Sequence, residues 1–397
     1  MRWTTGLVGV AFGAVLFVTR CGSNDGTCPT TINGSTACSR NGLVCPNPGT
    51  ECGSCVCNGS AFACTLGNCF DGGGTPTTCP APTNVFVDQP CTNGLTCASS
   101  GYACNAGSSA VCACTIGKWA CSCVTTPTVI AAGENALSIA VDDTSVYWIA
   151  FDVGAIRRAR KANDGGAPET LASGQSFASV LVLDAANVYW TNEDNPGGSV
   201  MTIPKGGGAP VALVQNEALP SSIAVDATNV YWGALGAVRT APIGGGSATT
   251  LVALSARVNG IAASATTVYC ATDDGLIAAP IAGGSEVMLS PGFANDVALD
   301  ANNVYWTTFS DVMQMSIATP STVTIASSNH DQPSGLAVDG TSVYWANGTA
   351  VMKAPIGGGP PVVVAFVAAL VRPEGIAVDS QNVYFATYDS HVMSAPK

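Results

Sequence analysis

The stretch Asn229-Val230-Tyr231-Trp232 decides the fold, because the chain repeats it at regular intervals. Its aromatic pair is the third of seven copies, and the steps between successive copies are 42, 42, 38, 36, 39 and 40 residues. The other copies begin at Tyr147, Tyr189, Tyr269, Tyr305, Tyr344 and Tyr384. A period of about 40 residues is typical of domains that are built from repeated supersecondary units.

Each copy of the unit contains four short segments that suit β-strands. The first two, 223–225 and 229–232, are rich in β-branched and aromatic residues, and the turn-favouring Asp226-Ala227-Thr228 separates them. A third segment, such as 349–356, and a fourth, such as 248–252, flank Gly-rich turns. Four antiparallel strands in each unit predict the blade of a β-propeller. We expect an all-β fold with a seven-bladed β-propeller over residues 126–397, or six blades if the divergent copy at Tyr269-Cys270 is irregular.

The ring has a predicted closure. The last copy ends with the third-strand segment 391–397 and has no fourth segment after it. The stretch Thr128-Val129-Ile130-Ala131-Ala132 resembles the fourth segments of other copies, such as 170–174. We therefore expect the N-terminal strand 128–132 to complete the last blade.

The cysteines divide the chain. Seventeen of the 18 lie between Cys21 and Cys123, and beyond Cys21 they form two similar sets of eight. Small exported modules with an even number of cysteines are typically held by disulfides, so we expect disulfide-rich modules at 28–78 and 79–124. Zinc is the rival hypothesis, but neither module contains a histidine. The modules would form a spacer or, alternatively, a small recognition module.

The N-terminus predicts export. Arg2 precedes an apolar segment at 6–18, which suits a signal peptide at 1–20 better than a membrane span. Val18-Thr19-Arg20-Cys21 resembles a bacterial lipobox, which predicts lipidation at Cys21 and a linker at 21–27, although Arg20 departs from the pattern. We expect an outer-membrane or cell-surface lipoprotein; the alternatives are a periplasmic or extracellular protein and a retained N-terminal anchor.

Charge and motifs exclude several functions. The net charge of −12 argues against nucleic acid, because no basic stripe is present to bind phosphates. The Asp that ends each first strand is expected to organise its turn. The Gly-Gly-Gly runs lack the Lys and Ser/Thr of a phosphate loop and are predicted to form hairpin turns. Cys270, at a Trp position, is expected to be a buried free thiol.

The two ends of the propeller differ in their loops. One end carries nearly uniform turns, whereas the loops between the second and third strands, and those that lead into each blade, vary. Scaffolds that diversify one face usually bind there, although the loops could simply be solvated. The candidate binding residues are Asp152, Glu193, Asp194, Asn259, Asp273, Asp274, Asn295, Asp296, Asp311, His330, Asp331, Glu374, Asp389 and His391.

The repeat also resembles a known group. Tyr189-Trp190-Thr191 and Tyr305-Trp306-Thr307 are similar to the Tyr-Trp-Thr-Asp repeat of lipoprotein-receptor propellers, and the whole unit resembles NHL and TolB-like propellers in exported cysteine-rich bacterial proteins. The resemblance implies a propeller and includes binders, scaffolds and some lyases. We expect a monomer that binds a protein, peptide or glycan, without a cofactor, and that meets the membrane only through its lipid. The alternative is a lyase or hydrolase with a divalent cation such as calcium at the channel mouth, where the two histidines could act.

Overall fold

The computed structural model describes residues 127–161, 166–194, 197–327, 333–348, 350–367, 373–387 and 390–397, together with the backbone of six strands upstream. The chain forms two compact units, Met1–Asn84 and Val85–Lys397. The first contains the sheet β1 (Val44–Pro46), β2 (Gly53–Cys57) and β3 (Phe62–Leu66). The second contains the sheet β4 (Thr96–Ser99), β5 (Ser108–Thr115) and β6 (Lys118–Thr125), and all later strands. The predicted signal peptide, Cys21 and disulfides lie outside the described residues, and the domain boundaries stay predictions.

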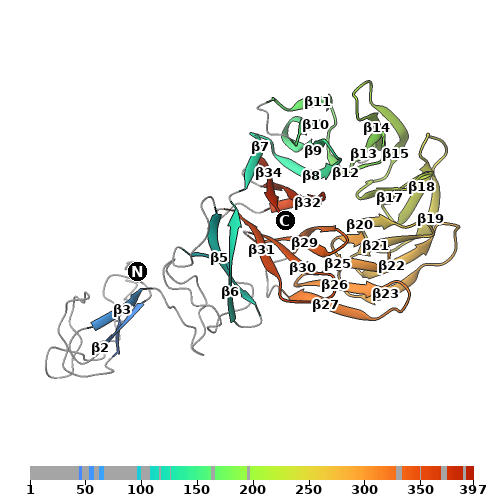
Figure 1. The fold of residues 1–397 in the computed structure, drawn as a ribbon. Helices are drawn as coiled ribbons and strands as arrows, with labels where there is room; N and C mark the ends of the chain where they lie inside the picture. Colours follow the sequence, from blue (N-terminus) through green and yellow to red (C-terminus); the bar gives the residue numbers. More distant parts are fainter. Residues whose placement is uncertain are drawn as a thin grey trace, which may run out of the picture. The chain divides into compact units, whose positions relative to one another are not determined.

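From β7 onward the strands form seven four-stranded antiparallel sheets, so the seven-bladed propeller is confirmed (Figure 1). Blade 1 contains β8 (Ala136–Val141), β9 (Ser145–Ala150), β10 (Ala155–Arg160) and β11 (Glu169–Ala172). Blade 2 contains β12 (Ala178–Leu183), β13 (Asn187–Asn192), β14 (Gly198–Pro204) and β15 (Val211–Glu217). Blade 3 contains β16 (Ile223–Val225), β17 (Asn229–Ala234), β18 (Ala237–Pro242) and β19 (Thr249–Ala253).

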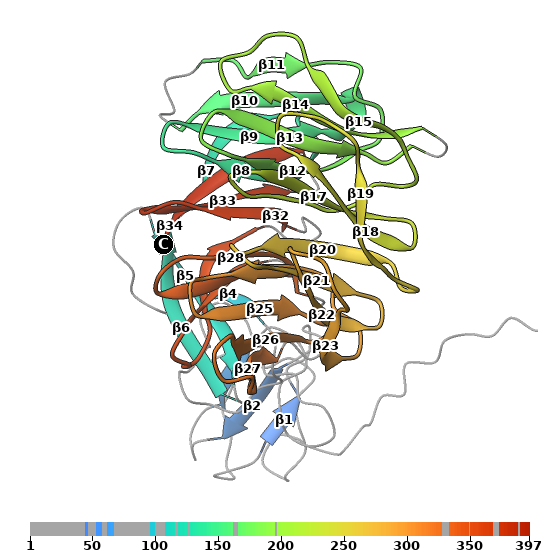
Figure 2. The same ribbon diagram turned by 90° about the vertical axis from the view of Figure 1, so that its right-hand side faces the viewer.

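The remaining blades follow the same plan around the ring (Figure 2). Blade 4 contains β20 (Val258–Ala263), β21 (Thr267–Thr272), β22 (Gly275–Pro280) and β23 (Val287–Pro291), so the divergent copy is a regular blade. Blade 5 contains β24 (Val297–Leu299), β25 (Asn303–Thr307), β26 (Asp311–Ser316) and β27 (Thr322–Ser327). Blade 6 contains β28 (Ser334–Val338), β29 (Ser342–Asn347), β30 (Ala350–Pro355) and β31 (Val362–Phe366).

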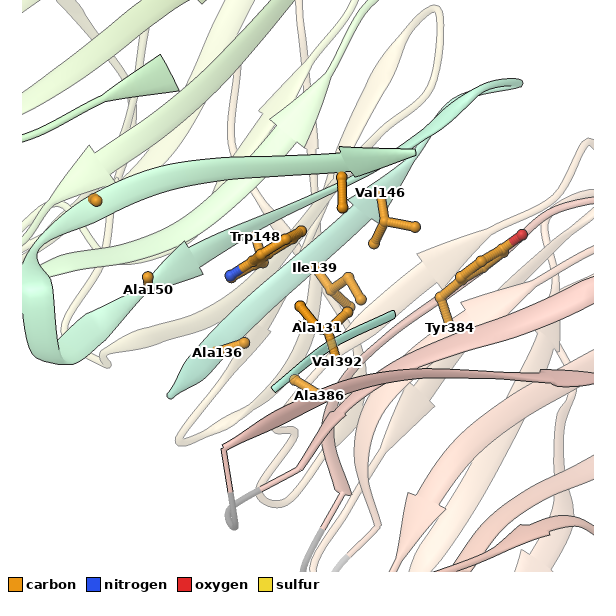
Figure 3. Packing of buried hydrophobic residues seen from close by; sticks show 11 residues of the cluster. Ala131, Ala136, Ile139, Val146, Trp148, Ala150, Tyr384, Ala386 and Val392 are labelled. Carbon is orange, nitrogen blue, oxygen red and sulfur yellow. The ribbon is translucent and has the colours of Figure 1, made fainter. Parts of the chain in front are cut away.

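Blade 7 joins two distant segments of the chain. It contains β32 (Pro373–Val378), β33 (Asn382–Thr387) and β34 (His391–Pro396), and its fourth strand is β7 (Thr128–Ala132). β7 runs antiparallel to β34, with Ala131 opposite Val392. Figure 3 shows these two side chains beside Ile139, Val146 and Trp148 of blade 1.

The repeated aromatic pair forms the core between blades. Adjacent residues of a strand point to opposite faces, so the Tyr of one blade meets the Trp of the next. Tyr189 of blade 2 thus packs with Trp232 of blade 3, and both are at least 98 % buried. Six junctions repeat this arrangement, with Phe385 and Cys270 as the variants of Trp. Cys270 is a buried free thiol as expected, and burial raises its pKa.

The repeated Asp holds the turn and the neighbouring Tyr together. Asp226 accepts hydrogen bonds from the backbone N–H of Thr228 (2.7 Å) and Asn229 (2.8 Å) and from the hydroxyl of Tyr231 (2.7 Å). Burial alone would raise the pKa of Asp226, but these hydrogen bonds lower it. The same set of bonds forms in blades 1, 2, 5, 6 and 7, whereas blade 4 has Ser264 in place of Asp. In each of these blades the Asp is therefore engaged within its own turn.

Candidate binding surface at the variable end

The strand directions place the described candidate residues at one end of the propeller, which we call the variable end. Second strands end there and first and third strands begin there. Asp152 lies in the 3-10 helix η1 (Phe151–Val153), between β9 and β10. The others precede, open or follow strands at the same end, namely Glu193, Asp194, Asn259, Asp273, Asp274, Asn295, Asp296, Asp311 and His391. His330, Asp331 and Asp389 lie outside the described residues, as does the side chain of Glu374.

Backbone hydrogen bonds join the loops of this end from blade 1 to blade 5. The N–H of Gln175 binds the carbonyl of Gly154 (2.8 Å), and the N–H of Glu193 binds that of Phe177 (2.9 Å). The series continues through Leu235 N–H to Ala218, Leu254 N–H to Gly236, Asp273 N–H to Arg257 and Gly292 N–H to Asp274. The bonds form two runs, from 154 to 193 and from 218 to 292, and the ion pair between Arg257 and Glu193 links the two runs into one surface.

The last step of the series is aromatic. The rings of Phe293 and Phe309 stack with centroids 4.0 Å apart, which links the loop before blade 5 to the turn after β25. We call the joined loops the rim arc, and it comprises residues 151–154, 175–177, 193–194, 218–219, 235–236, 254–257, 273–274, 292–293 and 308–311.

Large apolar side chains stand exposed on the rim arc. The exposed fractions are 60 % for Phe177, 70 % for Leu235 and 55 % for Phe309, and Phe151 and Val153 are also exposed. Most other exposed large apolar residues lie on the outermost strands, as Val211 and Val323 do. Apolar side chains that gather on loops around a channel mouth are typical of a binding surface.

Backbone strain is concentrated at the same end. Among the described residues, four that are not glycine have left-handed backbones, namely Phe177 (φ 56°), Asn216 (φ 59°), Leu219 (φ 49°) and Ser390 (φ 70°). Three of them lie in loops of the variable end, and Asn216 lies in β15 one residue before the strand ends there. A left-handed Phe or Leu costs free energy, and such residues cluster at binding and catalytic sites because the surrounding structure holds them there.

Buried carboxylates support the rim arc from below. Glu134 and Glu217 accept hydrogen bonds from the indole N–H of Trp148 (3.2 Å) and Trp232 (3.1 Å). Each Glu also pairs with an Arg, Arg157 at 3.2 Å and Arg239 at 2.8 Å.

Blade 2 replaces this charged set with a neutral one. Gln175 binds Trp190 (3.1 Å), and Met201 stands opposite Trp190 where the other two blades have Arg. The sequence carries a signal for this network that was not recognised: blades with the buried Glu have Arg opposite the Trp, and the blade with Gln has Met there.

The ion pairs leave the rim arc negative. Arg257 pairs with Glu193 at 3.1 Å, and Arg157 and Arg239 are bound to the buried Glu residues. The carboxylates of Asp152 and Asp273 accept hydrogen bonds from the side-chain amides of Asn135 (2.8 Å) and Asn259 (3.0 Å). No ion pair between described residues engages Asp152, Asp194, Asp273, Asp274 or Asp311.

The central channel begins inside the rim arc. It is a cavity of about 790 Å³ lined by the innermost strands, and Asp296 is the only charged side chain among its described lining residues. Burial raises the pKa of Asp296 to about 6, against the opposing effect of backbone hydrogen bonds from Val297 and Leu336. Asp296 therefore lies in the channel with a raised pKa, and not on the rim arc with the other carboxylates.

The described residues provide no grouping of three or more His, Cys, Asp and Glu side chains that could hold a metal ion. His391 opens β34, where its backbone N–H binds the hydroxyl of Thr387 at 3.3 Å. The expectations about cofactors and partners remain predictions.

No helix in the part of the chain that the structure describes is long and apolar enough to cross a membrane.

Comparison with known proteins identifies the fold. No family model and no curated protein sequence matches the chain. Virginiamycin B lyase from Staphylococcus aureus is similar in structure, with a TM-score of 0.59, 11% identity, and coverage of 68% of this chain and 98% of that one. The extracellular domain of the one component system BT4673 from B. thetaiotaomicron gives a TM-score of 0.55 at 12% identity, covering 68% and 39%.

A third similar structure is a computationally designed protein, Ika8. Its TM-score is 0.50 at 16% identity, with coverage of 74% of this chain and 95% of that one. Identities this low establish the shared β-propeller fold and nothing about what the chain binds.

Proposed function

We propose that the chain is an exported binding protein whose propeller recognises a protein, peptide or glycan through the rim arc. The N-terminal signal, lipidation at Cys21 and the disulfide-rich spacer belong to this proposal, because together they would hold the propeller at a cell surface. An extracellular domain among the similar structures is compatible with this location.

The observation that carries the proposal is the coincidence of three properties on one surface. The rim arc varies between blades, exposes large apolar side chains and contains left-handed Phe177 and Leu219. Burying one such side chain against a partner contributes about 1.5–3 kcal/mol. Three or four of them around a hydrogen-bonded rim would supply the central contacts of a protein interface.

A matched pair of triple variants tests the proposal. The full chain is screened against a random peptide display library and a glycan array. Changing Phe151, Phe177 and Phe309 together to Ser should abolish binding to the selected ligands, because their exposed rings would form the contact. Changing Val211, Val287 and Val323 to Ser is the control, because these residues are 55 %, 57 % and 55 % exposed on outermost strands.

Loss of binding only in the rim triple supports the proposal. Equal loss in both triples, or in neither, would overturn it. Thermal melting of both variants must match that of the wild type, so that unfolding is not mistaken for lost recognition.

The second candidate is a lyase or hydrolase that uses a divalent cation at the channel mouth. It draws on the likeness of the fold to virginiamycin B lyase. Calcium or magnesium bound there would stabilise the folded state by mass action, so added cation should raise the melting temperature. The binding-protein proposal expects the same melting temperature in calcium, in magnesium and in EDTA.

A further inference from the structure

One position of the innermost strands breaks the repeat inside the channel. In each blade an apolar residue stands three positions before the Asp of the turn (Ser264 in blade 4), and the residue just before that apolar residue lines the channel. The seven equivalents are Ser138, Val180, Ser222, Gly260, Asp296, Gly335 and Gly375, and all of them line the channel. Six are small or neutral, so the carboxylate of Asp296 is a departure of one blade from the common pattern.

Backbone groups fix the orientation of this carboxylate. Oδ1 accepts a hydrogen bond from the N–H of Val297 (2.8 Å), and Oδ2 accepts one from the N–H of Leu336 (2.9 Å) in the next blade. A carboxylate oxygen can accept two hydrogen bonds, so each oxygen keeps the capacity for a second donor. The carboxylate is held in place and still has acceptor sites to offer.

The neighbouring blade leaves room for it. A Cβ atom added to Gly260 would lie 3.0 Å from both Cα and Oδ1 of Asp296, so only glycine fits there without displacing the carboxylate. On the variable-end side of Asp296, Asn259 and Asn295 also line the channel and supply neutral polar groups. The site is therefore a fixed carboxylate in a narrow, mostly neutral passage that opens toward the rim arc.

An ionised carboxylate in such a place favours a positively charged partner. No Lys, Arg or His is among the described residues that line the channel. Removal of a carboxylate from bulk water is costly unless hydrogen bonds and a counter-charge compensate it. Two backbone donors provide part of that compensation, and a cation from outside would provide the rest.

We propose that Asp296 is the recognition site for one primary ammonium group that enters the channel from the rim arc. An ammonium carries three donors and a compact charge, and an uncharged lysine stem can lie in a channel whose described lining has no other charged side chain. The ammonium can belong to a lysine of a docked polypeptide or to a free alkylamine. The polypeptide source rests on the proposed function, whereas the free-amine source rests on the channel alone.

Calorimetry with the full chain tests the site with defined probes. Butylammonium is the free-amine probe, and n-butanol is its neutral control. A Gly-Ser peptide with one central lysine is the polypeptide probe, and the same peptide with norleucine is its uncharged control. We expect at least one charged probe to bind the wild type at least tenfold more tightly than its neutral control.

Two channel variants locate the binding. Asp296→Asn should reduce binding of the charged probe at least tenfold, and Asp143→Asn, in an exposed turn at the other end of the propeller, should leave it unchanged. Val180→Lys, on the opposite side of the channel, places an internal ammonium there and should abolish binding of the charged probe. This second variant tests the site independently, in case Asp296→Asn lowers stability. Unchanged affinity in Asp296→Asn and Val180→Lys, or equal binding of charged and neutral probes, would overturn the proposal.

The outcomes also separate this inference from the proposed function. If the selected library ligands depend on Phe151, Phe177 and Phe309 and neither charged probe binds more tightly than its neutral control, the channel site is wrong and the rim arc stands. If butylammonium binds at Asp296 while the rim triple variant keeps all library ligands, the channel site stands and the rim arc is wrong.

Discussion

The junctions on the two sides of the ring share one backbone arrangement and differ in one side chain. In every blade, the residue directly after the third strand donates its N–H to the carbonyl of a turn residue in the same blade. In blades 7, 1 and 2 this residue is a lysine, whereas in blades 3 to 6 it is an isoleucine. The seven residues in order from blade 1 are Lys161, Lys205, Ile243, Ile281, Ile317, Ile356 and Lys397.

Each lysine reaches back to the preceding blade. Lys161 of blade 1 pairs with Asp379 of blade 7, and Lys205 of blade 2 pairs with Asp142 of blade 1 at 3.2 Å. Lys397 pairs with Asp339 in the same way. Each ammonium also lies over the Tyr ring of the preceding blade, 4.9, 5.8 and 5.2 Å from the centroid for Lys161, Lys205 and Lys397.

The isoleucines cover the same Tyr rings with apolar contacts. Ile243 packs against the cluster that contains Tyr189, and Ile281 against the one that contains Tyr231. Ile317 belongs to blade 5, and the blade before it, blade 4, has Ser264 in place of the Asp. Ile317 is 38 % exposed. The blade 4 to blade 5 junction therefore has no such ion pair, and its isoleucine is more exposed than the half-buried isoleucines of the other three junctions.

The three ionic junctions are consecutive, and the middle one is the junction between blades 7 and 1. The ring closes inside blade 7, on one side of this junction, where β34 pairs with β7; residues 133–135 then connect β7 to β8 of blade 1. A half-buried ion pair and a half-buried isoleucine can contribute similar free energies, but an ion pair demands a specific partner. We infer that the lysines specify which blades meet beside blade 7, which the N-terminal strand completes, while isoleucines suffice on the other side of the ring.

The largest expected contrast is between Trp148 and Cys270, which occupy the same position of the repeated aromatic pair in blades 1 and 4. Trp148→Ala at the closure should lower the free energy of unfolding by about 3–5 kcal/mol, because it removes a large buried side chain. It also takes away the indole partner of Glu134. Cys270→Ala, at the equivalent place in blade 4, should cost about 1 kcal/mol because little volume is lost. Chemical denaturation of both variants measures the difference, and equal losses would contradict it.

The ionic junctions can be broken one at a time. Lys161→Met should lower the free energy of unfolding by about 1.5 kcal/mol, because Asp379 stays half-buried and loses a charged donor. Ile243→Met is the matched control on the other side of the ring and should change it by less than about 1.5 kcal/mol. A loss in the control as large as that in Lys161→Met would show that packing, and not charge, distinguishes the junctions.

Acid should weaken the ionic junctions, as the one between blades 1 and 2 shows. Burial opposes ionisation of Asp142, but hydrogen bonds from Thr144, Tyr147 and Lys205 lower its pKa to about 2. A carboxylate with a pKa lowered in the folded state contributes stability above its unfolded pKa of about 3.9 and loses it as pH falls through the folded value. The free energy of unfolding should therefore drop between about pH 5 and pH 2.

The control for this acid dependence is a variant without the carboxylate. Asp142→Asn should be less stable than the wild type at pH 7 and should show a smaller loss over the same acid range, as followed by urea titration at each pH.

Asp296 in the channel should affect stability in the opposite direction as the pH rises. Because burial raises the pKa of Asp296 to about 6, its carboxylate is least favourable in the folded state above that pH.

The smallest expected effect comes from moving a lysine across the ring. Ile243→Lys places an ammonium near Asp184, whose carboxylate is already bound by Tyr189 at 2.7 Å. The free energy of unfolding should change by about 0.5 kcal/mol or less, since the new pair replaces apolar contact. The pKa of Asp184, measured by NMR titration of its carboxyl carbon, should fall further. An unchanged pKa would mean that the backbone alone does not bring the pair together.

Much of the fold could be predicted from local patterns. Alternation along each Val-Tyr-Trp strand places two large rings on opposite faces, and only a closed ring of blades buries both. The Asp was correctly assigned to the turn, but its bond to the Tyr hydroxyl five residues later was not foreseen. That bond depends on how tightly the turn folds back, which turn-forming residues alone do not reveal.

The site was predictable only in outline. The variable end was recognised because its loops differ between copies, and the acidic residues were named for that reason. Phe177 and Leu235 were missed, since exposure of an apolar loop residue depends on neighbouring loops that are distant in sequence. Asp296 was grouped with the rim carboxylates, and its place inside the channel follows from the ring geometry and not from its neighbours Asn295 and Val297.

The pairing of β7 with β34 has a consequence for the order of events during synthesis. More than two hundred residues separate Ala131 from its partner Val392. Blades 1 to 6 can each collect their strands as they leave the ribosome, but β7 has no partner until β34 emerges. Until then the nascent ring exposes the apolar faces of blades 1 and 7, which is the condition under which multi-unit chains associate wrongly. Truncated or stalled chains of this protein should therefore be favoured clients of chaperones that bind apolar β-strands.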